Sequence, residues 1–301
     1  MSQMTPNTAA ESARTVSCSA VSQAASPDTE RAGSSGRGIE YTSYEANSWS
    51  CLFRQSGVKI LVDPWLVDEL TFAGQRWLYR GKKTHISPVD PDELAKGCDA
   101  VVLSQGLPDH AHEPTLKRIA KDTLVIASTA GAAVAESLGF RNVRTLDHGQ
   151  EMTLGNGKLR IKATVGALVG PPWAKRENGF LFTETTYGGV SLYYEPHCDY
   201  DVQSLQGTDS VDIVITPGVN QELLSFPLVM GKDNVVGLLK RLTPKVFLPL
   251  VNAEFDSEGP LSSLISEKGN VAGLPDVLKA EGLRDIELVV PDPGKATSVV
   301  C

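Results

Sequence analysis

The sequence is poor in cysteine, and its few cysteines form no recognisable pattern. They stand at positions 18, 51, 98, 198 and 301, so they are odd in number, widely spaced and without a C-x-x-C pair. This spacing fits neither a disulfide framework nor a zinc ribbon. We therefore expect a protein of a reducing compartment.

Long apolar runs and basic charge are also scarce. The most apolar long window, Leu124–Phe140, is rich in Ala and Gly and contains Glu136, so it divides into a strand and a helix and predicts no transmembrane span. The formal net charge of −8 and the sequence pI near 5.2 argue against nucleic acid or an anionic membrane surface as the main partner. A small-molecule ligand or substrate is the partner that this composition favours, and no apolar stripe indicates an oligomeric state.

Residues 1–39 have almost no large apolar residues and no periodicity, so this segment cannot bury enough surface to fold by itself. No apolar stretch follows the start, which excludes a secretory signal. Serine content and the arginines at 14, 31 and 37 favour an organellar transit peptide, whereas the acids at 11, 28 and 30 favour a plain disordered tail. We expect a leader over 1–39 and one folded domain over 40–301.

Strand and helix patterns alternate along the rest of the chain. Ser48–Arg54 and Val58–Val62 predict a β-hairpin, and Lys232–Leu242 has apolar residues at helical spacing. A second helical region is expected at about 260–281. Further helices are expected from Pro91, Pro114 and Ser128, and further strands at 99–103, 124–127, 143–146, 151–154, 158–164, 180–184, 190–194, 211–216, 245–249 and 286–290.

One stretch, Val101–Leu116, combines these elements with polar chemistry. It reads VVLSQGLPDHAHEPTL, which is a short apolar strand, a loop ending in Asp109-His110-Ala111-His112, and an amphipathic helix. It resembles the metal loop of the metallo-β-lactamase fold, in which the strand is followed by His-x-His-x-Asp-His. Carboxylate and imidazole are good zinc or iron ligands.

The resemblance covers about Tyr41–Pro291 and includes the opening hairpin, where Asn47-Ser48-Trp49 and Ile60–Pro64 match. It implies an α+β, four-layer αβ/βα sandwich, in which two mixed sheets face each other and helices lie outside. The most similar branch is one of lactonase-like and hydrolase-like proteins of bacteria, cyanobacteria and plant chloroplasts. The stretches that match this branch are Pro171-Pro172-Trp173, Glu177-Asn178-Gly179 and Leu192–Cys198. Together with the leader, this branch implies a plastid location.

Two metals would be expected in the family, but the ligands of the first are missing here. Its two histidines fall on Gln105 and Leu107, and the third falls within Val165–Val169, which contains no histidine. We therefore expect the first metal site to be lost.

The ligands of the second metal are partly retained. Its Asp-His pair falls on Asp109 and His110, its bridging carboxylate falls near Glu195-Pro196-His197, and its last histidine falls on Val251 or Asn252. Asp109, His110 and His197, with Glu195 or His112 as a further donor, would hold one Zn, Fe or Mn ion with an open position. The alternative is a metal-free pocket in which Asp109 orients an imidazole and Glu195 or His197 moves a proton.

The function implied is hydrolysis of a small ester, lactone or phosphoester with at most one metal ion. The alternative is a catalytically inactive binding or scaffold protein that uses the remnant cleft. Other residues receive structural roles. Asp63 is expected to be a turn carboxylate, His112 a surface residue, Cys198 a small packed residue, and both Trp173 and Tyr194 core aromatics with a second role as pocket walls.

Overall fold

The computed structural model describes residues 36–72, 74–170, 173–224, 226–251 and 256–301. The predicted leader up to residue 35, the Pro171-Pro172 part of one motif and position Asn252 lie outside the described residues. Among the described helices, none is long and apolar enough to cross a membrane.

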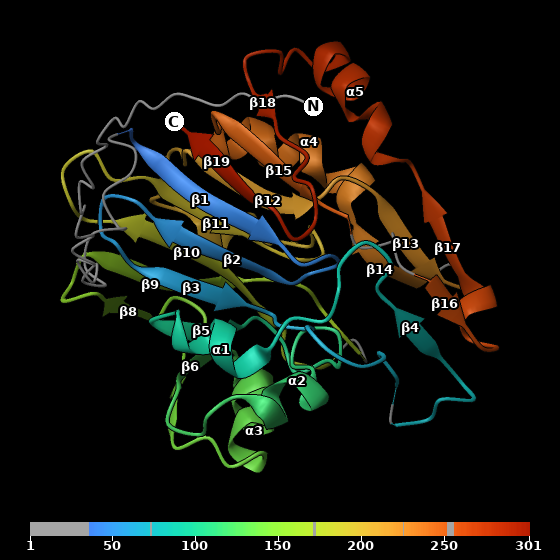
Figure 1. The fold of residues 1–301 in the computed structure, drawn as a ribbon. Helices are drawn as coiled ribbons and strands as arrows, with labels where there is room; N and C mark the ends of the chain where they lie inside the picture. The colour runs from blue at the N-terminus through green and yellow to red at the C-terminus, as the bar shows by residue number, and fades with distance from the viewer. Residues whose placement is uncertain (1–35, 73, 171–172, 225, 252–255) are drawn as a thin grey trace, which may run out of the picture. The chain divides into compact units, whose positions relative to one another are not determined.

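Two seven-stranded sheets form the centre of the domain (Figure 1). The first runs in the order β19–β1–β2–β3–β5–β6–β7, with β1 (Gly38–Ser43), β2 (Trp49–Phe53), β3 (Lys59–Val62), β5 (Ala100–Leu103), β6 (Leu124–Ala127), β7 (Asn142–Thr145) and β19 (Ala296–Val300). The second runs in the order β18–β15–β12–β11–β10–β9–β8, with β8 (Glu151–Leu154), β9 (Leu159–Val165), β10 (Asn178–Glu184), β11 (Ser191–Tyr194), β12 (Ile213–Pro217), β15 (Val246–Leu250) and β18 (Glu287–Leu288). Both sheets are mixed, since each combines antiparallel pairs with three parallel pairs.

The inner parallel strands β3, β5, β6, β12 and β15 are apolar at nearly every position because both of their faces are covered. In β3, Ile60 and Val62 belong to the core between the sheets, whereas Leu61 belongs to the core beneath the helices. In β12, Ile213 and Ile215 face the central core and Val214 faces the other helical layer. The side-chain period of two therefore divides each strand between two cores.

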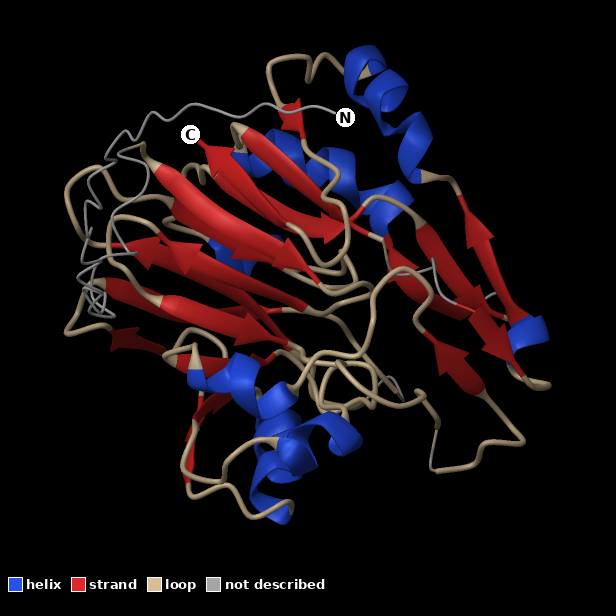
Figure 2. Ribbon diagram, viewed as in Figure 1, coloured by secondary structure: helices blue, strands red, loops and turns tan. Residues whose placement is uncertain are grey.

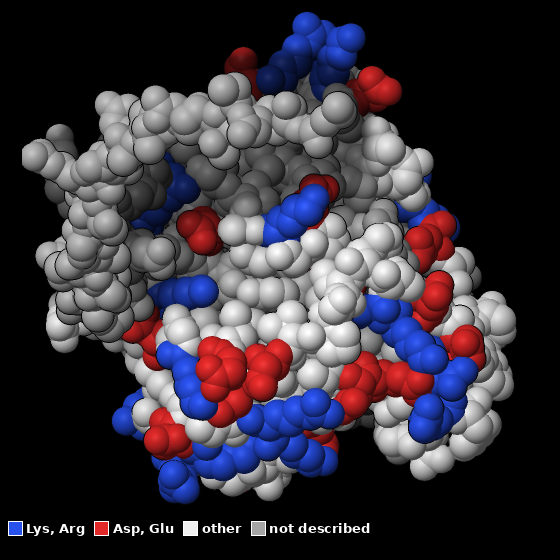
Figure 3. Space-filling model, viewed as in Figure 1, with Lys and Arg blue, Asp and Glu red and all other residues white. Residues whose placement is uncertain are grey.

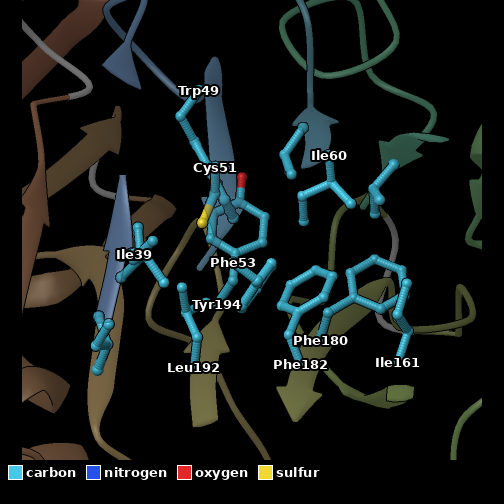
Figure 4. Close-up of a cluster of buried hydrophobic side chains, with 14 of the residues drawn as sticks. Ile39, Trp49, Cys51, Phe53, Ile60, Ile161, Phe180, Phe182, Leu192 and Tyr194 are labelled. Carbon is cyan, nitrogen blue, oxygen red and sulfur yellow. The ribbon is translucent and has the colours of Figure 1, made fainter. Parts of the chain in front are cut away.

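Aromatic side chains fill the central core between the two sheets (Figure 4). The Trp49 ring lies edge-on to Tyr194, with 5.1 Å between ring centroids, and also meets Phe182 at 6.3 Å. Because Trp49 comes from the first sheet and the other two rings from the second, these contacts join the sheets. Tyr194 is a buried core residue, as expected.

Helices cover the outer faces of the two sheets (Figure 2). The first sheet carries α1 (Pro91–Lys96), α2 (Glu113–Arg118) and α3 (Thr129–Ser137), and the second carries α4 (Gly231–Leu242) and α5 (Leu274–Ala280). Ser128 caps α3 by accepting a hydrogen bond from the N–H of Gly131. Buried residues of α4 follow helical spacing at Val235, Leu238, Leu239 and Leu242. This arrangement confirms the expected four-layer αβ/βα sandwich.

Two small sheets lie beside this sandwich, and one of them corrects a helix prediction. The three-stranded sheet β14–β13–β17 contains β13 (Asn220–Leu223), β14 (Phe226–Met230) and β17 (Ile265–Lys268), and β4 (Arg80–Lys82) pairs with β16 (Asp256–Glu258). The helix predicted over 260–281 is wrong, because this region contains the short 3₁₀ turn Ser262–Leu264, then β17, the 3₁₀ turn Val271–Gly273 and only then α5. Pairing of Ile265 with Leu223 outweighs local helical spacing, and Gly269, at a φ of 93°, breaks the run.

Acidic and basic side chains are interspersed over α1 and α2 in the lower part of the face shown in Figure 3. Ion pairs account for this mixture, such as Lys96 with Asp92 and Lys117 with Glu113, both at helical spacing. This part of the surface therefore carries no patch of one sign.

Candidate metal centre

The candidate site lies at one edge of the sandwich, where strands of both sheets end. Asp63 directly follows β3, the loop from Ser104 to His110 follows β5, and His197 lies three residues after β11. Asn47 precedes β2, and because β2 runs antiparallel to β3, its start lies at the same edge. Four loops that are distant in sequence therefore meet here.

Asp109, His110 and His197 come together as a group of candidate metal ligands. Each offers one ligand atom, and these atoms lie within 4.8 Å of one another. Asp109 Oδ2 is 3.3 Å from His110 Nε2, and the two imidazole centroids are 5.3 Å apart. Ligand atoms held about 2.0–2.2 Å from one ion are separated by roughly 3–4 Å, so a small inward movement would place all three on one ion.

Buried oxygen atoms around this group lack hydrogen-bond partners among the described residues. They are Asn47 Oδ1, Gln105 Oε1, Asp109 Oδ1 and Glu195 Oε1. Buried polar atoms are rarely left unpaired, and unpaired acceptors on residues that adjoin the two imidazoles favour a cation or a polar ligand there. The donor set and its unpaired oxygens therefore fit a divalent metal ion.

Asp63 orients the imidazole of His110. Its Oδ2 lies 2.8 Å from His110 Nδ1 and accepts a hydrogen bond from Tyr194 Oη at 2.6 Å, while Oδ1 accepts from the N–H of Ser104 at 2.7 Å. With Nδ1–H donated to Asp63, Nε2 faces Asp109 and Asn47, and it becomes available to a metal once it is deprotonated. The expectation of a turn carboxylate is therefore wrong, because Asp63 is fully buried and fixes a candidate ligand.

Charges within the site shift the pKa values of its members in opposite directions. Burial alone would raise the pKa of Asp109, but the neighbouring His110 outweighs it and holds this pKa well below its usual range. Burial would likewise lower the pKa of His110, yet Asp109 and Asp63 raise it well above its usual value. Burial, together with the charge of His110, lowers the pKa of His197 to about 4. His197 is therefore neutral at pH 7, which is the form that binds a metal.

The resemblance places two further ligands at Gln105 and Leu107, and both residues have other contacts. Gln105 is buried, and its Nε2 lies 3.4 Å from His197 Nδ1, which is a long contact. Leu107 lines the adjoining cavity. Among the described residues, the group of Asp109, His110 and His197 is the one found with metal-ligand spacing.

Two other sequence candidates, Glu195 and Cys198, lie outside this group. Glu195 Oε2 accepts hydrogen bonds from the N–H groups of His197 at 3.1 Å and Asp199 at 2.8 Å, so it shapes the turn that carries His197. Burial raises the pKa of Glu195 to about 7. Cys198 is buried among the side chains beneath α4, consistent with a packed residue.

Two structural expectations were wrong. His112 is 2% exposed rather than on the surface, because its ring packs near Trp65 and its Nδ1 lies 2.9 Å from Thr115 Oγ1. Burial lowers the pKa of His112 to about 4. Trp173 is 86% exposed and belongs to none of the described apolar clusters, so it is not a core residue.

A cavity of about 330 Å³ adjoins the group, and Asp109, His197 and Asn47 form part of its wall. Trp65 and Tyr79 line it from the loop between β3 and β4, and the three-stranded sheet lines another side. Burial raises the pKa of Tyr79 to about 12, with a further contribution from Asp109, so its phenol remains a hydrogen-bond donor at neutral pH. A small molecule in the cavity would touch the candidate ligands directly.

Comparison with known proteins agrees with this geometry. The sequence profile of a family described as beta-lactamase superfamily domain matches residues 40–251. A comparison with curated proteins gives no match.

Similar solved structures include three that this chain matches over nearly their whole length. An isothiocyanate hydrolase from Delia radicum gut bacteria has 21% identity and a TM-score of 0.62, covering 87% of this chain and 99% of that one. A possible metal-dependent hydrolase from Veillonella parvula has 17% identity and a TM-score of 0.63, covering 87% and 100%. The metallo-beta-lactamase fold protein YhfI from Bacillus subtilis has 14% identity and a TM-score of 0.53, covering 87% and 100%. At these identities the likeness shows a shared fold.

Proposed function

We propose that this chain, which belongs to the family of beta-lactamase superfamily domains, is a hydrolase that uses one divalent metal ion to cleave a small ester, lactone or phosphoester. The observation that carries the proposal is the approach of Asp109, His110 and His197 to within 4.8 Å of one another in the wall of a cavity. The names of two similar structures, an isothiocyanate hydrolase and a possible metal-dependent hydrolase, support the same class of reaction.

Each residue of the site has a defined task in this proposal. Asp109, His110 and His197 would hold the metal, which supplies Lewis-acid polarisation of the bond to be cleaved and a nucleophile at neutral pH. Asp63 would keep His110 oriented with Nε2 towards the site, and Gln105 contacts Nδ1 of His197. Hydrolysis adds the elements of water across the scissile bond.

Two further groups bear on proton transfer. Tyr79 is a neutral phenol in the cavity wall and can donate a hydrogen bond to a substrate oxygen that gains negative charge. The Oε2 atom of Glu195 accepts two backbone N–H groups, so we assign Glu195 the positioning of His197 rather than transfer of a substrate proton.

Metal analysis tests the proposal directly. Protein produced with zinc, iron and manganese available is expected to contain about one equivalent of metal, because a single three-ligand group is present among the described residues. Elemental analysis measures this content, and Leu107→Ala, which changes the cavity wall but no candidate ligand, is the control. A content near zero in both proteins would instead support the second candidate, a binding protein without catalysis, which the loss of ligands at Gln105 and Leu107 favours.

Metal binding is expected to release about one proton and to tighten as the pH rises. Asp109 and Asp63 raise the pKa of His110, so its imidazole is protonated at neutral pH and must lose that proton to bind a metal. Below this raised pKa, each pH unit changes the neutral fraction, and hence the apparent zinc affinity, by about tenfold. Calorimetry at about pH 6, 7 and 8, in two buffers of different ionisation enthalpy, measures both quantities. An affinity that stays constant over this range would contradict the expectation.

A further inference from the structure

The three-stranded sheet β14–β13–β17, whose strands are labelled in Figure 1, contributes residues to one wall of the cavity. Gln221 and Leu223 of β13 line the cavity, and they pair across the sheet with Glu267 and Ile265 of β17. Alternate residues of a strand share a face, so these four side chains form one wall. The residue between them, Glu222, hydrogen-bonds to Lys268 at 2.6 and 2.8 Å on the opposite face.

This wall begins beside the candidate metal centre and leads away from it. The N–H of Met230, at the end of β14, donates a hydrogen bond of 2.8 Å to the carbonyl of His197. Phe226 lies four residues earlier on the same strand, and at about 3.3 Å per residue it is roughly 13 Å from that anchor. The wall is therefore long enough for a chain of medium length.

The part of the wall that is distant from His197 is apolar. Leu223, Ile265, Phe226 and Leu228 line it, and Leu261 adds to it from the loop before β17. Phe226 is 51% exposed and Leu228 is 36% exposed, although both are large apolar residues. Apolar side chains that line a cavity while still exposed are typical of a ligand site.

Positive charge is missing from the wall. The described residues that line the cavity include Asp109 and Glu267 but no Lys or Arg. Phosphate and carboxylate groups are bound in proteins chiefly by Arg, Lys or clusters of N–H donors, because an anion loses its hydration in a cavity. Away from the candidate metal centre, the described residues of the wall therefore offer no cationic partner to a phosphate or carboxylate group on the chain of a substrate.

We infer that the substrate carries an uncharged apolar chain of medium length, which lies on the wall of Leu223, Ile265 and Phe226 while its scissile group reaches Asp109 and His197. This inference rests on the proposed function and narrows its substrate class to molecules with such a chain.

Binding and hydrolysis measured separately test this inference. Calorimetry on the full chain with octanamide, acetamide, 8-aminooctanamide and 7-carboxyheptanamide measures binding without turnover, and octanamide is expected to bind at least about tenfold more tightly than each of the others, because the last two place a charge at the far end of the chain. Hydrolysis is followed with the p-nitrophenyl esters of octanoate and acetate and with p-nitrophenyl phosphate. The octanoate is expected to have the highest kcat/KM.

Two matched variants test where the apolar chain of the substrate binds. Leu223→Ser is expected to weaken octanamide binding by about tenfold, because it removes apolar contact area from the wall. Leu224→Ser makes the same change at a neighbouring residue that is 70% exposed and does not line the cavity, and it is expected to leave binding unchanged. Circular dichroism checks that both variants fold.

The outcomes separate the inference from the proposed function. Preferential octanamide binding without hydrolysis of any ester would support the inference about the ligand and reject the hydrolase. Hydrolysis without preference for the longer chain, equal effects of the two variants, or tighter binding of 8-aminooctanamide or 7-carboxyheptanamide would overturn the inference, and the first of these would leave the hydrolase standing.

Discussion

Replacing His110 by alanine is expected to abolish stoichiometric metal binding and to lower kcat/KM by a factor of about 10³ or more, since Lewis-acid catalysis contributes several kcal/mol to the transition state. His110 carries this effect because it is fully buried, is held by Asp63 through Nδ1, and approaches Asp109 Oδ2 to 3.3 Å through Nε2. Elemental analysis and initial rates with the best ester substrate measure the two losses.

A matched control tests whether the effect comes from the loss of this candidate ligand or would follow the loss of any partly buried histidine. His148→Ala removes a half-buried imidazole whose Nε2 contacts the carbonyl of Glu177 at 3.1 Å, away from the ligand group. This variant is expected to keep its metal and its rate. If His110→Ala keeps one equivalent of metal while remaining folded, the ligand set is wrong and the metal-centred hydrolase is rejected.

Much of the fold could be predicted from the sequence because its central elements obey simple local rules. Strand β5 is a pure apolar run, α3 has its Ser128 cap, and α4 has apolar residues at helical spacing, so local pattern and final structure agree. In the loop that follows β5, Asp109 and His110 could also be recognised as candidate ligands from the sequence alone. His197 could be proposed because it follows an apolar strand whose end meets the same edge.

Other parts of the site depended on contacts that sequence spacing does not contain. Asp63 precedes a proline, and this local pattern favours a turn residue. In the structure its side chain instead accepts hydrogen bonds from residues 41 and 131 positions away, which the sequence does not show. Asn47, which sequence reasoning matched only to the opening hairpin, places its Nδ2 within 3.2 Å of Asp109 and 3.1 Å of His110. The signal for Asp63 was its place directly after an apolar strand in Leu61-Val62-Asp63-Pro64.

The wall of the cavity was missed for a related reason. Ile265 forms a strand only because Leu223 pairs with it from 42 positions earlier, whereas its neighbours in sequence suggested a helix. The proposed substrate wall thus depends on the segment whose local pattern is weakest, while the candidate ligands lie on loops fixed by the strongest strands.

Replacing Asp63 by alanine is expected to lower the free energy of unfolding by about 3–5 kcal/mol, because removing one partner of a buried network leaves the others unpaired. The groups left without an acceptor are the Nδ1–H of His110, the N–H of Ser104 and the hydroxyl of Tyr194. Chemical denaturation measures the change. Asp147→Ala, at an exposed carboxylate, is the control and is expected to change stability by less than about 0.5 kcal/mol.

Asp63→Asn separates the role of Asp63 in stability from its role toward His110. The amide keeps the size of the side chain and can still accept from Ser104, so the loss of stability is expected to be smaller than in Asp63→Ala. However, an Nδ2 group facing His110 Nδ1 favours the tautomer protonated at Nε2, and that nitrogen then cannot bind a metal. Metal affinity is therefore expected to fall by about 10- to 100-fold. If Asp63→Asn binds metal as the unmodified protein does, Asp63 supports the fold but does not orient His110, and the lone pair of Nε2 must be fixed by its other contacts with Asn47 and Asp109.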